Sequence, residues 1–531
     1  MSDPQSTYTA KALSPELQKY RRNTWNNWVN IHAESKPDEP AFRFLGRETT
    51  WSELRDHIGR FADALSRRGV GAGDRVMIMA LNCTEFVEAV LGANEIGAIA
   101  VPVNFRLTPA ELAYLVGDCT PKAVVTDSLL APLVPAIAAA GGDTGFHVVI
   151  GGESGAEGQE TWEDLQKEGG EPHPAIDVEE DAVALIMYTS GTTGRPKGAM
   201  LTHMNMVAQS LTCIRVFRVL HDEGVSICAV PMFHIAALGS MAPSLQVGAL
   251  TVINPLQEFD PGQVLDTLEA EKITAVFLVP VQWQAVCAEQ QSNPRSLVLE
   301  NISWGAAPAT DTVLRAMAET FPEARNSAVF GQTEMAPVTC SLDGDEALRK
   351  IGSVGRVIPT IQARVVDPLG EDVAPGEVGE IVYRGPTMMA GYWNKPEETE
   401  KAFDGGWFHS GDLVRVDDEG FVYVVDRVKD MIISGGENIY CAEVENAIAG
   451  HERIREVAVI GKQDEKWGEV PIAVIAMADE GPDLTVDELR EYLADKVASY
   501  KRPKELVFVD ALPRNASGKV TKHTLRADVV S

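Results

Sequence analysis

Residues with the chemistry to bind phosphate are concentrated in one stretch, Thr-Ser-Gly-Thr-Thr-Gly-Arg-Pro-Lys-Gly at positions 189–198. The apolar run at residues 182–188, which leads into this stretch, predicts a buried strand. Glycines allow backbone N–H groups to turn toward an anion, hydroxyl groups donate further hydrogen bonds, and a lysine adds positive charge. The stretch therefore predicts a phosphate-binding loop with contacts from Thr189, Ser190, Gly191, Thr192, Thr193, Gly194 and Lys197.

This loop differs from the common P-loop of nucleotide-binding proteins. A P-loop has Gly-Lys followed by Ser or Thr at the start of a helix. Here Pro196 precedes Lys197 and Gly198 follows it, which favours an extended loop over an immediate helix. A simple Gly/Thr surface loop is the alternative interpretation, but the complete run after a buried strand favours phosphate binding.

Small or polar residues also follow other expected strands, at the strand end where α/β sheets bind ligands. His234 ends the sequence Pro-Met-Phe-His after an apolar run at residues 227–230. A packed histidine is the simpler interpretation there. A second segment consists of Gly305, Ala306, Ala307 and Pro308, whose small side chains would let a flat base approach the backbone. An ordinary tight turn is the simpler interpretation of that segment.

Two carboxylates have neighbours that suit ligand binding. Glu334 follows Gly331, Gln332 and Thr333, and a carboxylate in such a turn can hold Mg²⁺ together with phosphate oxygens. Asp412 follows Ser-Gly, and a carboxylate suits a diol because it only accepts hydrogen bonds. The alternatives are a solvated surface glutamate and an aspartate that caps a turn.

The composition of the 531-residue chain, with 45% hydrophobic and 23% charged residues, indicates a globular protein of two or more domains. A formal net charge of −31 disfavours nucleic acid and anionic membrane surfaces as partners. Seven scattered cysteines without a CxxC pair predict reduced thiols in the cytoplasm and no zinc site. Residues 1–23 lack the apolar core of a signal peptide, and residues 86–103 are too short and too polar to span a membrane.

Short apolar strands alternate with helical patterns, so the sequence predicts an α/β fold with largely parallel sheets. Thr50 and Thr108 each begin a Thr-x-x-Glu capping box, which predicts a helix start. Residues 151–181 are rich in glycine and glutamate, and we expect a loose surface connection there.

The pattern changes after residue 352. Residues 352–426 show strand-like alternation broken by Gly and Pro, as in a small β subdomain, and about a hundred residues with their own pattern follow. We therefore expect a large N-terminal domain at residues 1–428, made of two α/β subdomains and the small β subdomain. A smaller, mobile α+β domain is expected at residues 429–531.

Five motifs occur in the order typical of one superfamily: positions 189–198, Gly-Gln-Thr-Glu at 331–334, Ser-Gly-Asp at 410–412, Asp-Arg-Val-Lys-Asp at 426–430 and Pro-Arg-Asn-Ala-Ser-Gly-Lys at 513–519. They resemble those of the adenylate-forming enzymes, which include acyl-CoA synthetases, luciferases and adenylation domains of peptide synthetases. The resemblance runs from Trp25 to the end of the chain and is strongest to bacterial fatty-acyl-CoA synthetases. It implies a ligase of fatty-acid and lipid metabolism that uses ATP, Mg²⁺ and coenzyme A. The implied reaction converts a medium- or long-chain fatty acid to an acyl-adenylate and then to an acyl-CoA, with release of pyrophosphate and AMP.

The resemblance also implies roles for individual residues. Lys519 would be the catalytic lysine that bridges the substrate carboxylate and the α-phosphate, His234 would border the acid site, and Glu334 with Thr189 would hold Mg²⁺. Gly435 and Gly436 would lie beside the pantetheine arm of CoA in the second half-reaction. The remaining nucleotide contacts would come from Gly305, Ala306, Ala307, Pro308, Gly331, Gln332, Thr333, Asp412, Arg427 and Lys429. Two positions depart from the pattern, because Phe330 replaces the commoner tyrosine and Leu238 replaces a gating tryptophan found in some long-chain enzymes.

Several alternatives stay open at this point. The acid could instead be an aryl or steroid-derived acid, the acceptor could be a carrier protein, or the chain could be a non-catalytic nucleotide-binding regulator. Trp283 could shorten the acid pocket or belong to the core. The sequence also leaves a homodimer open.

Overall fold

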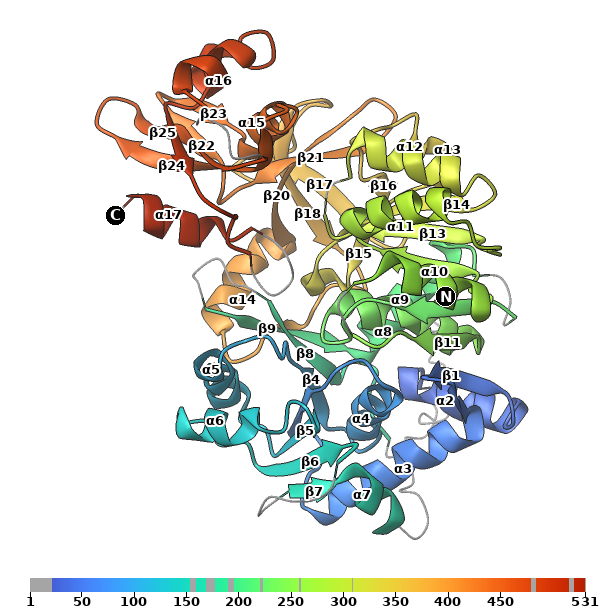
Figure 1. The fold of residues 1–531 in the computed structure, drawn as a ribbon. Helices are drawn as coiled ribbons and strands as arrows, with labels where there is room; N and C mark the ends of the chain where they lie inside the picture. The colour runs from blue at the N-terminus through green and yellow to red at the C-terminus, as the bar shows by residue number, and fades with distance from the viewer. Residues whose placement is uncertain are drawn as a thin grey trace, which may run out of the picture.

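The computed structural model describes residues 22–152, 159–168, 177–189, 195–219, 223–256, 259–307, 309–478, 484–514 and 520–530. Four β-sheets organise these residues, and helices cover their faces (Figure 1). The predicted α/β class with a small β part and a C-terminal α+β part is confirmed. None of the described helices is long and apolar enough to cross a membrane.

The first sheet carries the predicted phosphate-binding segment. Its strands lie in the order β19 (Gly391–Tyr392), β9 (Lys197–Thr202), β8 (Val183–Thr189), β4 (Ile99–Pro102), β3 (Arg75–Met79), β5 (Ala123–Asp127), β6 (Phe146–Ile150) and β7 (Gln159–Thr161). From β8 to β7 the pairing is parallel, whereas β9 is antiparallel to both β8 and β19. The antiparallel hairpin of β8 and β9 thus brings both arms of the loop together.

Helices cover both faces of this sheet because its side chains alternate between two cores. In β3, Val76 and Ile78 pack with α3 (Trp51–Arg67) and α4 (Thr84–Glu95). The other face of the sheet packs against α5 (Pro109–Cys119) and α6 (Leu133–Ala139). Figure 1 shows these two helix layers on either side of the strands.

The capping boxes predicted for two helices are present. The Thr50 and Thr108 hydroxyls accept hydrogen bonds from the backbone N–H groups of Glu53 and Glu111, and the glutamate carboxylates accept hydrogen bonds from the backbone N–H groups of the two threonines. The loose connection expected over residues 151–181 is wrong in part, because it contains β7 and α7 (Trp162–Glu168). Trp162 and Leu165 are buried against α3 and its neighbours, and their spacing of three residues was the available signal.

The second sheet carries the other strand-end segments. Its order is β16 (Arg356–Val357), β15 (Val338–Leu342), β14 (Arg325–Gly331), β13 (Asn301–Gly305), β12 (Ala275–Leu278), β10 (Val225–Cys228), β11 (Leu250–Ile253), β1 (Pro40–Phe44) and β2 (Arg47–Thr50). One face packs on α10 (Pro261–Ala270), α11 (Pro280–Ser292) and α12 (Asp311–Thr320). The other face packs on α8 (His203–Val216) and α9 (Ile235–Val247), with α2 (Trp25–Ser35) beside them.

Trp283 belongs to the core of this second α/β part. Its side chain in α11 is fully buried, its ring lies 5.7 Å from that of Phe321, and its indole N–H donates a hydrogen bond of 2.9 Å to the carbonyl oxygen of Ser303. Of the two roles left open by the sequence, core packing is therefore the observed one.

The remaining sheets form the predicted small β part and the C-terminal part. The third sheet is antiparallel, in the order β17 (Gln362–Val366), β18 (Val378–Arg384), β20 (Phe408–Val416) and β21 (Val422–Arg427). Along the chain, α13 (Gly344–Ala347) precedes β17, and α14 (Pro396–Ala402) lies between β18 and β20. The fourth has the order β23 (Glu437–Ile439), β22 (Ile432–Ser434), β25 (Gly468–Met477) and β24 (Ile454–Asp464), and β26 (Glu505–Phe508) also pairs with β25.

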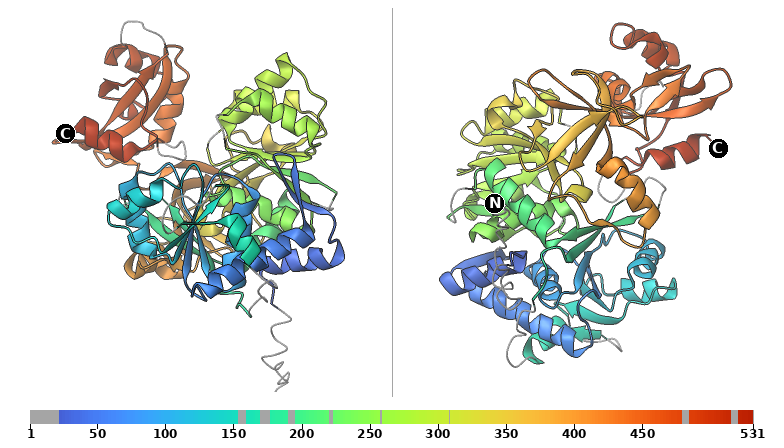
Figure 2. Two further views of the ribbon diagram at one scale, coloured as in Figure 1. Left: turned by 60° about the horizontal axis from the view of Figure 1, so that its bottom comes forward. Right: turned by 180° about the vertical axis from the view of Figure 1, so that it is seen from behind.

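Helices also cover both faces of the fourth sheet. Its two cores are formed with α15 (Cys441–Ala449) and α16 (Val486–Tyr492) on one face and with α17 (Lys522–Val530) on the other. This C-terminal part projects from the rest of the molecule (Figure 2). The chain passes from the third sheet to the fourth between Arg427 and Ile432. The domain division at 428/429 stays a prediction that agrees with this change of sheet.

All seven cysteines are buried as free thiols. Burial raises the pKa of Cys213, Cys228 and Cys340 to about 12 and that of Cys287 to about 11. The prediction that the cysteines pack as thiols is confirmed.

Candidate active site

The two arms of the predicted phosphate loop lie side by side. Thr189 ends β8, Lys197 begins β9, and the two residues are paired across the hairpin. The hydroxyl of Thr189 lies 3.4 Å from the carbonyl oxygen of Lys197. The loop residues between them, Ser190, Gly191, Thr192, Thr193 and Gly194, lie outside the described residues, so their contacts stay predictions.

Glu334 joins this hairpin to the second sheet. It lies in a short 3-10 helix, η2 (Thr333–Met335), directly after β14, and it is only 9% exposed. Its Oε1 atom accepts a hydrogen bond of 3.0 Å from the Tyr392 hydroxyl and lies 3.4 Å from the Thr189 hydroxyl. The structure therefore brings together Thr189 and Glu334, the two residues predicted to hold Mg²⁺.

A tight turn aims Glu334 at the hairpin. The backbone N–H of Gln332 donates a hydrogen bond of 2.8 Å to the carbonyl oxygen of Pro337. A Cβ atom on Gly331 would lie 1.8 Å from that same oxygen, so only glycine fits at this position. Gly331 and Gln332 thus shape the turn that holds Glu334, which is a structural reason for their presence in the motif.

The turn predicted to meet the adenine base lies beside this segment. Gly305 ends β13 and pairs with Val329 in the neighbouring parallel strand β14. Because the carboxyl ends of parallel strands meet at one sheet edge, the exposed residues Ala306 and Ala307 lie at the same edge as Glu334. Pro308 lies outside the described residues.

His234 occupies the N-cap position of α9. Its ring lies 4.4 Å from that of Phe233, which in turn contacts Phe105 at 5.4 Å. Asn82 fixes this segment, because its side chain donates to the carbonyl oxygen of Val230 and accepts from the backbone N–H of Met232, both at 2.9 Å. Asn82 is 1% exposed and was missed by the sequence analysis, in which nothing connects it to a segment 148 residues away.

Asp412 and Arg427 are also brought together. They are paired across β20 and β21, and the Nε atom of Arg427 lies 2.7 Å from Oδ1 of Asp412. Asp412 is 2% exposed, whereas 42% of the Arg427 side chain is accessible. The buried carboxylate is therefore held by a cation that can itself reach a ligand at the surface.

Four predicted residues belong to the C-terminal part of the chain: two for the second half-reaction, Lys429 for a nucleotide contact and Lys519 for adenylation. Gly435 and Gly436 form the turn between β22 and β23, and the N–H of Gly435 donates a hydrogen bond of 2.7 Å to the carbonyl oxygen of Trp467. Lys429 is exposed in the connection between the third and fourth sheets. Lys519 lies outside the described residues, so its predicted meeting with the phosphate loop stays a prediction.

Further residues that the sequence analysis did not single out hold the β8–β9 hairpin in place. The segment Gly391–Tyr392 pairs with β9, and the Tyr392 ring lies 5.1 Å from the Lys197 ammonium group. Asp118 at the end of α5 accepts a hydrogen bond of 2.7 Å from Tyr188 and pairs with Lys395 at 3.2 Å. These contacts join residues 70 to 277 positions apart, which explains why local patterns gave no signal.

The donor set fits a magnesium ion that arrives with a phosphate ligand. No group of three or more His, Cys, Asp or Glu side chains that could hold a metal occurs among the described residues. Mg²⁺ is commonly bound by one or two carboxylates together with substrate phosphates and water. Both contacts of Glu334 involve Oε1, so its second oxygen accepts no hydrogen bond within the described part of the chain.

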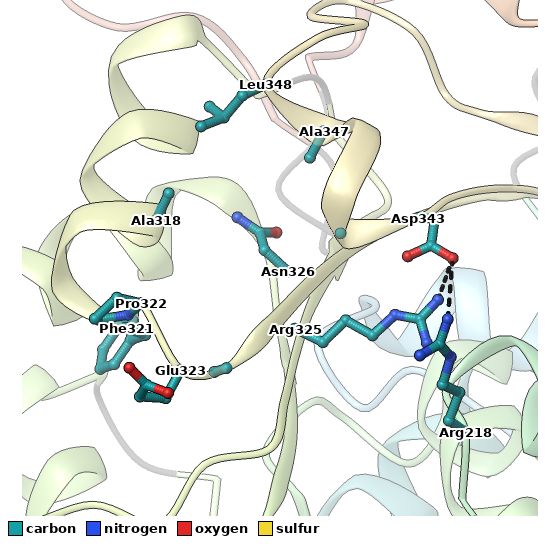
Figure 3. A pocket seen from close by; sticks show the side chains of 12 residues that line it. Arg218, Ala318, Phe321, Pro322, Glu323, Arg325, Asn326, Asp343, Ala347 and Leu348 are labelled. Atoms are coloured by element: carbon teal, nitrogen blue, oxygen red, sulfur yellow. Dashed lines mark hydrogen bonds and ion pairs between the residues drawn. The ribbon is translucent and has the colours of Figure 1, made fainter.

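A separate cavity of about 340 Å³ lies at the opposite end of β14 (Figure 3). There the guanidinium groups of Arg218 and Arg325 both face Asp343, with 3.9 Å between Arg218 and the carboxylate. Arg325 begins the strand and Gly331 ends it, so the cavity is roughly 20 Å from the site around Glu334. The Nε and Nη1 atoms of Arg325 are buried, so they do not face an incoming ligand.

Comparison with known proteins agrees with this arrangement. Residues 29–393 match the family described as AMP-binding enzyme, and residues 443–519 match the AMP-binding enzyme C-terminal domain. A feruloyl-CoA synthase of Amycolatopsis sp is 39% identical over 509 residues, which cover 95% of this chain and 99% of that protein. The long-chain-fatty-acid–CoA ligase FadD13 of Mycobacterium tuberculosis is 35% identical over 486 residues, covering 90% and 92%.

The fold is likewise shared with a solved structure. It is o-succinylbenzoate coenzyme A synthetase (MenE) from Bacillus subtilis in complex with ATP and magnesium ion, with a TM-score of 0.82 and 29% identity. The match covers 94% of this chain and 99% of that one. The first family match alone spans more than half of the chain, and it includes the β8–β9 hairpin and Glu334. The chain is therefore a member of the AMP-binding enzyme family, the adenylate-forming superfamily that its motifs resemble.

Proposed function

We propose that the protein is an AMP-forming acid–CoA ligase that uses ATP, Mg²⁺ and coenzyme A. A carboxylate oxygen of the acid attacks the α-phosphorus of ATP, and the bond to the departing pyrophosphate breaks. The thiol of CoA then attacks the carbonyl carbon of the acyl-adenylate, loses its proton, and AMP leaves. The observation that carries the proposal is the contact of Glu334 with both Thr189 and Tyr392, which supports a carboxylate available to Mg²⁺ next to the first residue of the predicted phosphate loop.

Each site residue that the structure describes has a distinct task in the proposed reaction. Thr189 and Lys197 hold the β- and γ-phosphates, which depart as pyrophosphate. Glu334 binds Mg²⁺, whose chemistry is to neutralise charge on the phosphate oxygens. Asp412 accepts hydrogen bonds from the ribose hydroxyls, and Ala306 lies against the adenine base.

The second domain completes the site. We propose that residues 429–531 pivot on the connection after Arg427, so that Lys519 serves adenylation and the turn at Gly435 and Gly436 serves thioester formation. Such alternation is a hinge motion around a fixed site. Asp426 and Arg427 end β21, and Ile432 begins β22, which leaves a short connection for the pivot.

The packing around the acid site favours a compact acid. A Cβ atom on Gly239 in α9 would lie 2.8 Å from Cδ of Pro337, so the helix and the segment after η2 are in direct contact. Leu238 and Met335 on either side are fully buried in the same core. This close packing supports an aryl acid or a short to medium acyl chain as the substrate, because a long chain would need the two segments to separate. The fatty acid favoured by the motifs stays the second candidate.

A screen of pyrophosphate release tests the proposal. Purified protein is given ATP, Mg²⁺ and single acids, from acetate to long-chain, aryl and steroid acids, with and without CoA. We expect pyrophosphate release with aryl acids such as ferulate to exceed that with palmitate, and a CoA thioester to be detected by mass spectrometry. Release without any acid dependence would contradict the function, and thioester formation only on an added carrier protein would favour the acyl-AMP ligase.

Lys519→Ala tests the first step separately from the second. Removal of the charge that stabilises the pentacoordinate transition state at phosphorus is expected to lower adenylation by about 10²- to 10³-fold. Thioester formation from added acyl-adenylate and CoA should be kept. The opposite pattern would show that Lys519 does not serve adenylation.

A further inference from the structure

The segment of residues 391–395 is fixed at both of its ends. On one side β19 pairs with β9, and the N–H of Trp393 donates a hydrogen bond of 2.8 Å to the carbonyl oxygen of Gly198. On the other side the carbonyl oxygen of Asp118 accepts hydrogen bonds from the side chains of Trp393 and Asn394, at 3.1 and 3.0 Å. The backbone at Tyr392 is therefore held rigidly between α5 and the phosphate hairpin.

From this position the Tyr392 side chain reaches two groups of the site. Its hydroxyl lies 3.0 Å from Oε1 of Glu334, and its ring lies 5.1 Å from the ammonium group of Lys197. A tyrosine hydroxyl is protonated at neutral pH, because its ordinary pKa is about 10. It therefore acts as a hydrogen-bond donor to the carboxylate.

Tyr392 provides the stronger of the two contacts to Glu334. The Thr189 hydroxyl has a single proton, and it lies 3.4 Å from both Glu334 and the carbonyl oxygen of Lys197. It can donate to only one of them at a time. Without Tyr392 the carboxylate would keep only this longer, shared contact.

We propose that Tyr392 is a positioning residue for the metal-binding carboxylate. Its hydroxyl fixes one oxygen of Glu334 and leaves the second oxygen for the ion, while its ring holds the ammonium group of Lys197 in place by a cation–π contact. The inference rests on the proposed function, because it assigns the ion to Glu334.

Two substitutions separate the tasks of the hydroxyl and the ring. Tyr392→Phe removes the hydroxyl and keeps the ring, so it should weaken metal binding by about tenfold or more. Saturating MgATP should largely restore the rate, because the ion arrives with the phosphates and its weaker binding appears as a raised KM for MgATP. Tyr392→Leu also removes the ring that contacts Lys197 and should raise the KM for MgATP further.

Metal binding is measured without turnover. Mn²⁺ is titrated by electron paramagnetic resonance in the presence of α,β-methylene-ATP, which cannot release pyrophosphate. Tyr423→Phe is the matched control, because its hydroxyl lies 3.4 Å from Asp417 in the third sheet and makes no contact with Glu334. It should bind Mn²⁺ as the wild type does.

A double-mutant cycle keeps the test decisive if the substitution disturbs folding. In the Glu334→Gln background, Tyr392→Phe should have little further effect on Mn²⁺ binding, since its target carboxylate is gone. An equal loss in both backgrounds would overturn the proposal, as would wild-type Mn²⁺ affinity in Tyr392→Phe. If the wild type itself releases no pyrophosphate with any acid, the proposed function fails; if it is active and Tyr392→Phe is unchanged, only this inference fails.

Discussion

At the scale of single residues, the paired Asp412 and Arg427 show how a buried carboxylate is kept ready for a ligand. The pair is formed across neighbouring strands, so the backbone fixes both ends of the contact at 2.7 Å. The Asp412 side chain is almost fully buried, and a buried carboxylate needs a partner whether or not nucleotide is bound. Ribose hydroxyls would add hydrogen bonds to a carboxylate that is already oriented.

Asp412→Asn should weaken the use of ATP by about 10- to 100-fold in kcat/KM, because hydrogen bonds to a charged group contribute about 1.5–3 kcal/mol. The measurement is pyrophosphate release with ATP and with 2′-deoxy-ATP. The wild type should prefer ATP, and the variant should lose most of that preference. Asp418→Asn, at an exposed position in the turn between β20 and β21, is the control. An unchanged preference for ATP in Asp412→Asn would show that the ribose binds elsewhere.

Two buried histidines give the fold a defined acid sensitivity. His147 in β6 is 4% exposed and makes a hydrogen bond of 2.7 Å with Thr126, and burial lowers its pKa to about 4. Burial lowers the pKa of His203 to about 4 as well. Because these folded-state pKa values lie below the ordinary histidine value of 6.5, stability is full above pH 6.5 and is lost as the pH falls toward 4.

His147→Gln should remove the part of this stability loss that comes from protonation of His147, while keeping a hydrogen-bond partner for Thr126. That part is on the order of 3 kcal/mol of unfolding free energy between pH 7.5 and pH 4. Urea unfolding at pH 7.5, 5.5 and 4.0 measures it, and the variant should lose less stability than the wild type over that interval. Equal losses would mean that His147 is accessible to protons in the folded state.

At the scale of elements, α17 is fastened to the connection between the third and fourth sheets. Lys522 lies 2.7 Å from Glu445 in α15, and both side chains are largely buried. Arg526 in the same helix lies 2.9 Å from Asp430. The helix that follows the segment of Lys519 is therefore tied to the connection around which the domain is proposed to turn.

Breaking the Lys522–Glu445 pair on one side should be costly. Lys522→Met would leave the Glu445 carboxylate buried without its partner, which typically costs about 3–5 kcal/mol. Hydrogen–deuterium exchange of α15 and α17 should reveal the loosening. Adding Glu445→Gln should recover most of the protection, since the amide oxygen can still accept the N–H of Val459. Unchanged exchange in the single variant would contradict the packing described.

Local patterns predicted most elements but not the contacts between them. Capping boxes gave the starts of α3 and α5, and apolar runs gave the strands that carry Thr189 and Gly305. The family motifs named Glu334, yet no pattern named Tyr392, whose role depends on a partner 58 residues away. The same holds for Asn82 and Asp118, because a tertiary contact leaves no trace in local periodicity.

At the scale of the whole molecule, the proposed motion needs a flexible point between the sheets. Val428 donates to the carbonyl oxygen of Gly411, and Asp430 and Met431 donate to that of Arg427, at 2.9 to 3.1 Å. The backbone N–H of Lys429 makes no hydrogen bond within the described residues, and its side chain is exposed. Proline at this position would therefore restrict rotation without removing a described contact.

Relative to Lys429→Ala, Lys429→Pro should leave acyl-adenylate formation nearly unchanged and lower thioester formation by at least about tenfold, because a fixed φ opposes the pivot. Single-turnover pyrophosphate release and mass spectrometry of the CoA thioester measure the two steps separately. Lys429→Ala serves as the control for loss of the side chain. An equal fall in both steps would indicate a folding defect rather than a blocked motion.

The burial of all seven cysteines has a consequence for an enzyme whose proposed second substrate is itself a thiol. Exchange with the disulfide of such a cofactor requires an accessible thiolate, and burial both covers these sulfur atoms and raises the pKa of each. In the native chain, none of the seven thiols should therefore react with Ellman's reagent, whereas all seven should react once the chain is unfolded in urea. After incubation with oxidised coenzyme A, the activity measured with fresh reduced coenzyme A should be unchanged, so that oxidative stress would deprive the enzyme of its reduced acceptor before it damaged the enzyme.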